Sequence, residues 1–328
     1  MISADDVQPT FDKLKKSFGS HKTRAYNWRI EQLQKLSIGI QKLSSELEQA
    51  MKADLGRECF ISYAGEIGIL IGTIKHDAIS LKSWMVDHPE KIELLLAPGA
   101  AYTRYEPLGV VAIIGSWNAP IITCLRPLVQ AICAGNTCIV KPSEHSPVTS
   151  GVIKKLIDEH MDNDFFACLQ GGIDVASTIN KLPVDLICFT GSTQVGKIIA
   201  KVAAERLTPC ILELGGKCPL VIDHTVNVDF ASSKVAYGKT VNSGQICIAP
   251  DYVFVHESKV KEFVEQIQVK LKQMYGEGKP EGSEWQGKMI NDFHTERVEK
   301  LIKGAGGTLV CGGDVNKKIK HIEPTVIL

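Results

Sequence analysis

The sequence predicts an α/β protein in which a doubly wound parallel sheet is followed by a second α/β region. After Leu108, short apolar runs such as VVAII and LICF alternate with helical stretches. Strands that alternate with helices imply a parallel sheet covered by helices. The runs are continuously apolar, as expected for strands that are buried on both faces.

The segment before this sheet is expected to be helical and to end in an extended arm. From Phe11 to about Asp87, apolar residues recur three and four positions apart, which predicts a helical lead-in. Prolines then punctuate residues 88–107, whose AYTRY run predicts a strand or hairpin arm for bridging or oligomerisation.

Strands and helices can be assigned along the rest of the chain. In the first region we expect strands at 109–115, 136–141, 166–170 and 185–189, and helices at 121–133, 147–160 and briefly before 185. In the second we expect strands at ILEL after Cys210, at 219–223 and at 251–256, and helices at 228–241 and 259–274. The predicted domains are therefore 1–87 with 108–209, and 210–328. Because the chain ends on the apolar run PTVIL, we expect the second domain to be incomplete.

Composition excludes several classes of protein. The 328 residues are 44% hydrophobic and 23% charged, which is typical of a folded globular chain. Lys plus Arg and Asp plus Glu both number 37, so no net charge favours nucleic acid. The N-terminus has no continuous apolar stretch, and we expect a cytoplasmic or membrane-peripheral protein.

The ten cysteines do not form a recognisable ligand or disulfide pattern. No C-x-x-C pair or matched histidine spacing occurs, so neither a zinc site nor any other metal site is expected. Most of these cysteines lie in apolar runs and are expected to be small buried hydrophobic residues. Cys247 differs, because it follows a helix in the glycine-containing turn NSGQIC, where reactive cysteines are found.

Two segments at the ends of predicted strands are candidates for binding a nucleotide. FTGSTQVG follows a strand and opens a helix, so its backbone N–H groups could face a phosphate; alternatively it is only a turn. The residues concerned are Gly191, Ser192, Thr193, Gln194, Val195 and Gly196. Lys141 and Glu144 follow another strand and would suit a ribose diol, or else are a solvated lysine and a helix N-terminal glutamate.

Two further residues are candidates for catalysis. Asn118 follows the first buried strand and could donate its amide to a developing oxyanion, although Asn before X-Pro is also a common turn residue. Glu213 ends a strand before two glycines; in a partly buried position it would suit a general base.

These blocks, in their order, resemble the aldehyde dehydrogenase superfamily. WNAP, KPSE, FTGSTQVG, ELGGK and NSGQICIAPDY carry the resemblance, and LTPCILELGGK and CIAPDY are most similar to its class 3 and fatty-aldehyde branch. The resemblance extends from Phe11 to Leu328. It implies a dinucleotide-binding domain followed by a catalytic domain.

The resemblance also implies a role for each candidate residue. Cys247 would be the nucleophile, Glu213 the general base, and Asn118 with the Cys247 backbone N–H the oxyanion hole. Lys141 and Glu144 would bind the adenosine ribose, and residues 191–196 would lie by the pyrophosphate. The expected reaction converts an aldehyde to a carboxylic acid by way of a thioester, with hydride transfer to NAD or, as an alternative, NADP.

The sequence departs from the family pattern in two places. Ser116 and Ala119 replace the usual proline and aromatic residue beside the Trp-Asn pair, which predicts a different aldehyde tunnel. The later E-x-F-G-P block and the C-terminal oligomerisation arm lie outside this sequence, so a homodimer is expected only if that arm is supplied. The alternative is a catalytically weak or inactive dinucleotide-binding or interaction module.

Overall fold

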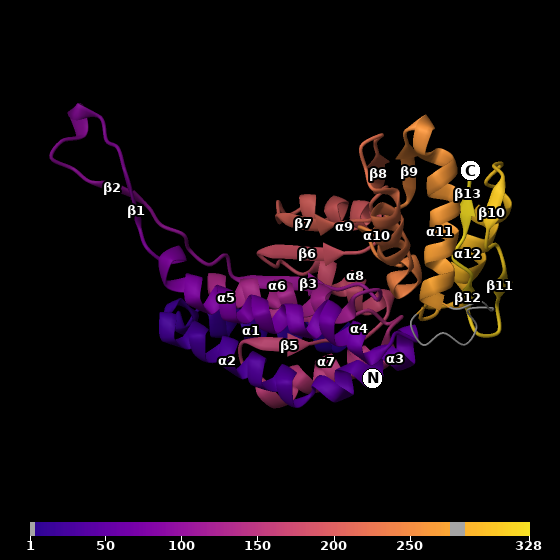
Figure 1. Ribbon diagram of the computed structural model, residues 1–328. Coiled ribbons are helices and arrows are strands. Elements are labelled where there is room, and N and C mark those ends of the chain that lie inside the picture. Colours follow the sequence, from indigo (N-terminus) through magenta and orange to yellow (C-terminus); the bar gives the residue numbers. More distant parts are fainter. Residues whose placement is uncertain (1–3, 276–285) are drawn as a thin grey trace.

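A five-stranded parallel sheet lies at the centre of the first region of the molecule (Figure 1). The computed structural model describes residues 4–275 and 286–328. The strand order is β5-β4-β3-β6-β7. The strands are β3 (Val110–Ile114), β4 (Thr137–Lys141), β5 (Phe166–Cys168), β6 (Leu186–Thr190) and β7 (Cys210–Glu213). The prediction of a parallel sheet is confirmed.

Helices cover both faces of this sheet because successive residues of the buried strands point to opposite sides. In β3, Val111 and Ile113 pack on one face, whereas Val110, Ala112 and Ile114 pack on the other. The first face is covered by α2 (Tyr26–Lys42), α3 (Ser44–Leu55), α5 (Gly68–Trp84), α6 (Pro120–Ala134) and α7 (Pro147–His160). The second face is covered by α1 (Val7–Phe18), α8 (Ile173–Lys181) and α9 (Thr193–Ala204).

The segment between α3 and α5 contains a π-helical turn. The short helix α4 (Cys59–Ser62) continues into the π-helix η3 (Tyr63–Ile67), which runs directly into α5. Glu66 of this turn is buried. A π-turn widens the helix locally and is often found at functional positions.

A two-stranded arm projects from the body of the protein (Figure 1). Its strands, β1 (His88–Glu90) and β2 (Ala101–Thr103), are antiparallel and exposed. The arm's base is closed by two hydrogen bonds from Arg104 to Asp87, of 2.8 and 2.6 Å. The predicted hairpin is confirmed, and its bridging or oligomerising role stays a prediction.

One strand belongs to a different sheet from the one expected. The sequence assigned the ILEL run after Cys210 to the second region, but β7 pairs in parallel with β6, from Ile187 beside Cys210 to Thr190 beside Glu213. The reason is that α9 returns the chain alongside β6, the usual connection between neighbouring parallel strands. As the last strand of the sheet, β7 alternates half-buried and exposed residues.

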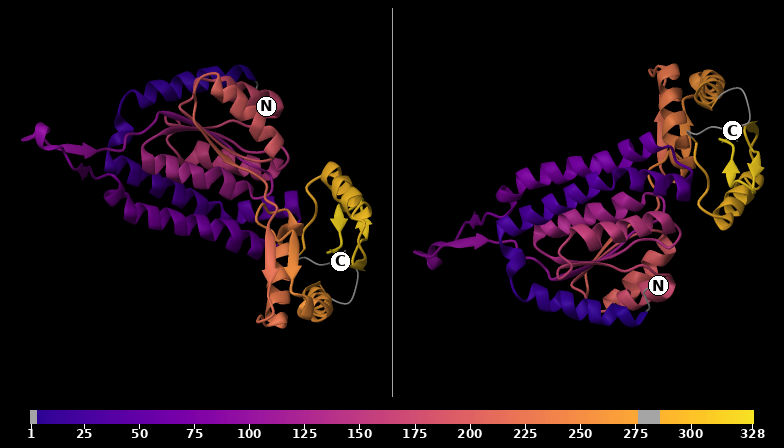
Figure 2. Two further views of the ribbon diagram at one scale, coloured as in Figure 1. Left: turned by 90° about the horizontal axis from the view of Figure 1, so that it is seen from above. Right: turned by 90° about the horizontal axis from the view of Figure 1, so that it is seen from below.

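The second region starts with its own parallel pair, β8 (Pro219–Ile222) and β9 (Tyr252–Val255). Helices α10 (Val228–Thr240) and α11 (Val260–Tyr275) pack against this pair. Helix α12 (Asp292–Lys303) and the antiparallel pairs β10 (Leu309–Cys311) with β13 (Val326–Ile327) and β11 (Val315–Asn316) with β12 (His321–Ile322) follow. Figure 2 shows this region at one end of the first. Among the described residues, no helix is long and apolar enough to cross a membrane.

Candidate active site

Cys247 is distinguished from the other cysteines by its exposure. All ten lie in the described part of the chain, and Cys247 is the one that is exposed. Burial raises the pKa of the Cys124 and Cys133 thiols to about 12 and that of Cys188 to about 11. These buried thiols are therefore poor nucleophiles at neutral pH, because the thiolate is the reactive form.

The turn that presents Cys247 has unusual backbone geometry. Asn242, Ser243 and Gly244 have φ values of 56°, 54° and 73°. Left-handed backbone is unfavourable for residues with a Cβ, so two of these three residues are strained. The side chain of Gln245 stabilises the turn by donating to the carbonyl oxygens of Asn242 and Lys288, both at 3.0 Å.

Asn118 lies against this turn, although 129 positions separate it from Cys247 in the sequence. Its Nδ2 donates to the carbonyl oxygen of Gln245 at 2.8 Å, and its own carbonyl accepts from Asn242 Nδ2 at 2.9 Å. Its side-chain oxygen accepts from Ser116 Oγ at 2.6 Å, which fixes the amide orientation. A second N–H of the amide remains to donate elsewhere.

The ELGGK segment also packs on the Cys247 turn. A Cβ on Gly216 would lie 2.6 Å from the Cys247 carbonyl oxygen, so only glycine fits there. The Cys218 thiol lies 3.0 Å from the same oxygen. Glu213 lies at the end of β7, but its side chain is exposed. The expectation of partial burial is wrong, because β7 is the outermost strand on its side of the sheet.

The Lys141 and Glu144 side chains form an ion pair at the end of β4. The Nζ to Oε2 distance is 2.6 Å, and the side chains are 3% and 35% exposed, respectively. Burial alone would raise the pKa of Glu144, but hydrogen bonds from Lys141 and from the backbone, with the lysine charge, lower it overall. The partly exposed Glu144 carboxylate therefore lies beside a buried lysine, and it can still accept hydrogen bonds from two hydroxyl groups.

The segment 191–196 forms the N-terminus of α9, next to the end of β6. Ser192 Oγ accepts from Val195 N at 3.3 Å and caps the helix. Thr193 and Gln194 are exposed. Gly191 is required by close packing, because a Cβ there would overlap the Phe189 ring. Backbone N–H groups at this helix end can bind phosphate.

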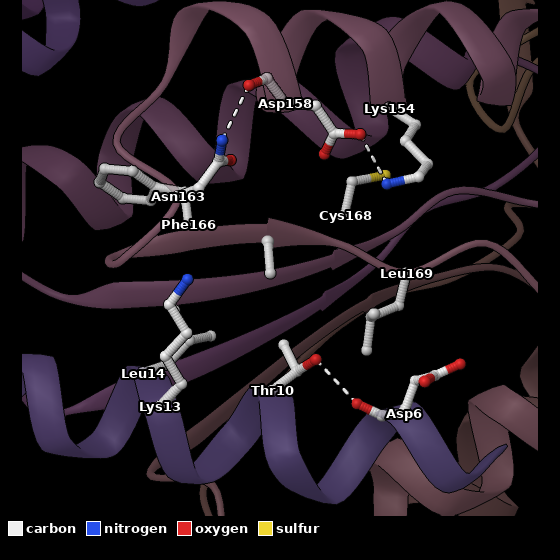
Figure 3. Close-up of a pocket in the computed structure, with 11 residues that line it drawn as sticks. Asp6, Thr10, Lys13, Leu14, Lys154, Asp158, Asn163, Phe166, Cys168 and Leu169 are labelled. Carbon is white, nitrogen blue, oxygen red and sulfur yellow. Dashed lines mark hydrogen bonds and ion pairs between the residues drawn. The ribbon is translucent and has the colours of Figure 1, made fainter. Parts of the chain in front are cut away.

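A separate cavity of about 280 Å³ lies beside β5, near α1 and α7 (Figure 3). Its charged groups already have partners, as Lys154 pairs with Asp158 at 2.6 Å and Lys13 with Asp164 at 3.1 Å. None of the predicted site residues line it. β5 and β7 are the two edge strands of the sheet, so this cavity beside β5 is distinct from the candidate site.

The residues that hold the site together could not be identified from the sequence. Gln245 was part of a motif but had no assigned role, and Lys288 and Glu66 were not singled out. The Lys288 backbone N–H donates to Leu55 O at 2.8 Å, and its Nζ donates to Ala53 O at 2.8 Å. Such contacts between distant segments leave no local pattern in the sequence.

Comparison with protein-family models matches residues 1–328 to the description "Aldehyde dehydrogenase family". The chain belongs to this family. It is 38% identical over 98% of its length to 4,4'-diaponeurosporen-aldehyde dehydrogenase of Staphylococcus aureus. It is 35% identical over 98% of its length to the dimeric NADP-preferring aldehyde dehydrogenase of Rattus norvegicus. The chain spans 70% of the length of each of these two relatives and 64% of that of aldehyde dehydrogenase family 3 member A2 of Mus musculus.

A solved structure supports the same assignment of the fold. The structure described as the substrate-bound state of Staphylococcus aureus AldH aligns with a TM-score of 0.94 and 38% identity. The alignment covers 98% of this chain and 70% of that one. The fold is therefore that of an aldehyde dehydrogenase, as the resemblance implied.

Proposed function

We propose that this protein oxidises aldehydes to carboxylic acids through a covalent thioester on Cys247. The observation that supports this most directly is the contact between the Asn118 amide and the turn that presents the one exposed cysteine among the ten, all of them in described residues. A nucleophile beside an amide donor is the arrangement that acyl chemistry requires. Within the described residues, the Cys247 backbone N–H also has no acceptor and can donate to an oxyanion.

The proposed chemistry assigns a separate step to each residue. The Cys247 thiolate adds to the aldehyde carbon, and the alkoxide accepts hydrogen bonds from Asn118 and from the Cys247 N–H. A nicotinamide cofactor held by Lys141, Glu144 and residues 191–196 would supply the hydride acceptor, so that loss of hydride from this carbon would leave a thioester on Cys247. Glu213 then takes a proton from water as the water attacks the thioester, which releases the acid and restores the thiolate. Exposure of Glu213 would give the water access.

For the cofactor, we propose NAD, with NADP also accepted. Lys141 and Glu144 would hold the adenosine ribose, and residues 191–196 the pyrophosphate. The Glu144 carboxylate would repel a 2′-phosphate, but Lys141, 2.6 Å away, offsets part of that charge. Replacing Glu144 with Gln should therefore shift the ratio of NADP to NAD use upwards.

The test is hydride transfer with a matched pair of cysteine variants. The protein is incubated with a medium-chain aldehyde and either NAD or NADP, and formation of the reduced cofactor is followed by absorbance. We expect turnover in the unmodified chain and in Cys311→Ser, and none in Cys247→Ser. Cofactor binding measured by calorimetry without turnover in the unmodified chain would instead favour a dinucleotide-binding or interaction module.

A further inference from the structure

A buried carboxylate from a distant segment caps the helix that follows Asn118. Glu66 Oε2 accepts from the backbone N–H groups of Ile121 and Ile122, at 2.9 and 3.0 Å. These N–H groups are in the first turn of α6, where a helix has no partners of its own. Ala119 stands at the N-cap position of α6 and provides no side-chain cap. Glu66 therefore supplies the acceptor that the local sequence lacks.

The capping carboxylate is held by a buried cation. Arg57 is 5% exposed and Glu66 is 2% exposed, and the two form an ion pair. Arg57 also donates to Ser62 Oγ at 3.2 Å. A buried ion pair of this kind adds little to the free energy of unfolding, because the loss of hydration by both charges offsets their attraction. Its geometry is nevertheless specific, because one Glu66 oxygen faces Arg57 and the other faces α6.

The capped end of α6 leads directly to the site. α6 begins at Pro120, two residues after Asn118. Ser116 N donates to Thr123 Oγ1 at 3.0 Å, so the loop that carries Asn118 is fastened to the first turn of the helix. On its other side Asn118 donates to Gln245 O. We therefore expect a shift of the start of α6 to change where the Asn118 amide lies relative to the Cys247 turn.

We propose that Glu66, held by Arg57, is a positioning residue that sets the Asn118 amide for stabilising an oxyanion on the Cys247 adduct. The proposal rests on the proposed function. It assigns to Glu66 no contact with substrate or cofactor. A displacement of about 1 Å in a catalytic group can cost about 100-fold in rate, so a missing cap is expected to be visible in kinetics.

Two double variants separate the cap from the buried charge. Arg57→Met/Glu66→Gln removes both charges but keeps an amide oxygen that can accept from Ile121 and Ile122. Arg57→Met/Glu66→Met also removes both charges, but its residue 66 has no oxygen to accept from Ile121 and Ile122. Neither variant leaves an unpaired buried charge, which is the usual reason for such substitutions to unfold a protein. Thermal unfolding of both confirms that the comparison is made on folded protein.

Two reactions of Cys247 provide the readout. Acylation by p-nitrophenyl acetate passes through an oxyanion and needs Asn118, whereas alkylation by iodoacetamide does not. We expect acylation to be about 10- to 100-fold slower in Arg57→Met/Glu66→Met than in Arg57→Met/Glu66→Gln. The alkylation rates of these two double variants should agree within about 2-fold. When Asn118→Ala is added, the two variants should acylate at the same rate.

The opposing outcomes are distinct. Equal acylation rates in the two variants that retain Asn118 would overturn the positioning role. A parallel loss of acylation and alkylation would also overturn it, because the cap would then shape the whole turn rather than Asn118. Absence of acylation at Cys247 in the unmodified chain would instead overturn the proposed function, and the variants would not be needed to see this.

Discussion

Replacing Gln245 with Ala should release the turn that presents Cys247. The Gln245 side chain makes three hydrogen bonds of 3.0 Å, to the carbonyls of Asn242 and Lys288 and from the N–H of Ile290. At about 1 kcal/mol each, they contribute about 3 kcal/mol. The left-handed conformations of Asn242 and Ser243 oppose this by roughly 2–4 kcal/mol. Loss of about 3 kcal/mol should make opening of the turn about 100-fold more frequent.

Hydrogen exchange followed by mass spectrometry measures this opening directly. We expect peptides covering residues 241–250 to exchange about 100-fold faster in Gln245→Ala, while peptides covering β3 are unchanged. Gln268→Ala is the matched control, because Gln268 Nε2 donates once, to Val264 O at 2.9 Å within α11. Unchanged exchange of residues 241–250 in Gln245→Ala would contradict this prediction, because the strained turn would then be stable without its side-chain contacts.

Three further predictions follow from exposure, charge and the proposed roles. Limiting iodoacetamide should label Cys247 before any other cysteine, as peptide mapping would show; earlier labelling of Cys59 or Cys311 would remove the main support for the nucleophile. Glu213→Gln should slow deacylation by about 10²- to 10⁴-fold, so mass spectrometry should detect a trapped thioester, and unchanged steady-state turnover would rule out the base role. The pKa of Glu144 is lowered below its usual 4.5, so its ion pair with the neighbouring lysine is complete above about pH 4.5 and is lost as the pH falls through the lowered value. Glu144 therefore stays ionised from pH 8 to 5, and the NAD affinity measured by calorimetry should fall through protonation of Glu144 only at lower pH, on protein that remains folded. A decline in affinity centred near pH 6.5 would point to another group.

The parallel sheet could be predicted because its strands are short, continuous apolar runs between helices. The site could be predicted in outline for a similar reason, since the carboxyl ends of parallel strands share one edge, and Lys141 and Glu213 each lie at such an end. The proximity of Asn118 to the Cys247 turn came from the resemblance, because no spacing rule connects residues 129 positions apart.

What the sequence did not reveal depends on contacts between distant segments. The exposure of Glu213 follows from the place of β7 in the sheet, which strand propensity alone does not determine. The cap on α6 comes from Glu66, 55 positions before Ile121, and the sequence near Ala119 gives only the absence of a normal cap. A buried glutamate on a π-turn has no distinct sequence signature, because the same letter is usually found on the surface.

The contacts that shape the Cys247 turn join segments that are far apart in the chain. The turn accepts a hydrogen bond from Asn118, 127 positions before Gln245. The Gln245 side chain donates to Lys288, which in turn donates to Ala53, 235 positions earlier. Closing such long loops costs conformational entropy, which is offset only when the distant partners meet. On the ribosome, the hydrogen bond between Lys288 and Ala53 cannot form until Lys288 has been synthesised and has left the exit tunnel. The full set of contacts around the Cys247 turn therefore requires both regions of the chain.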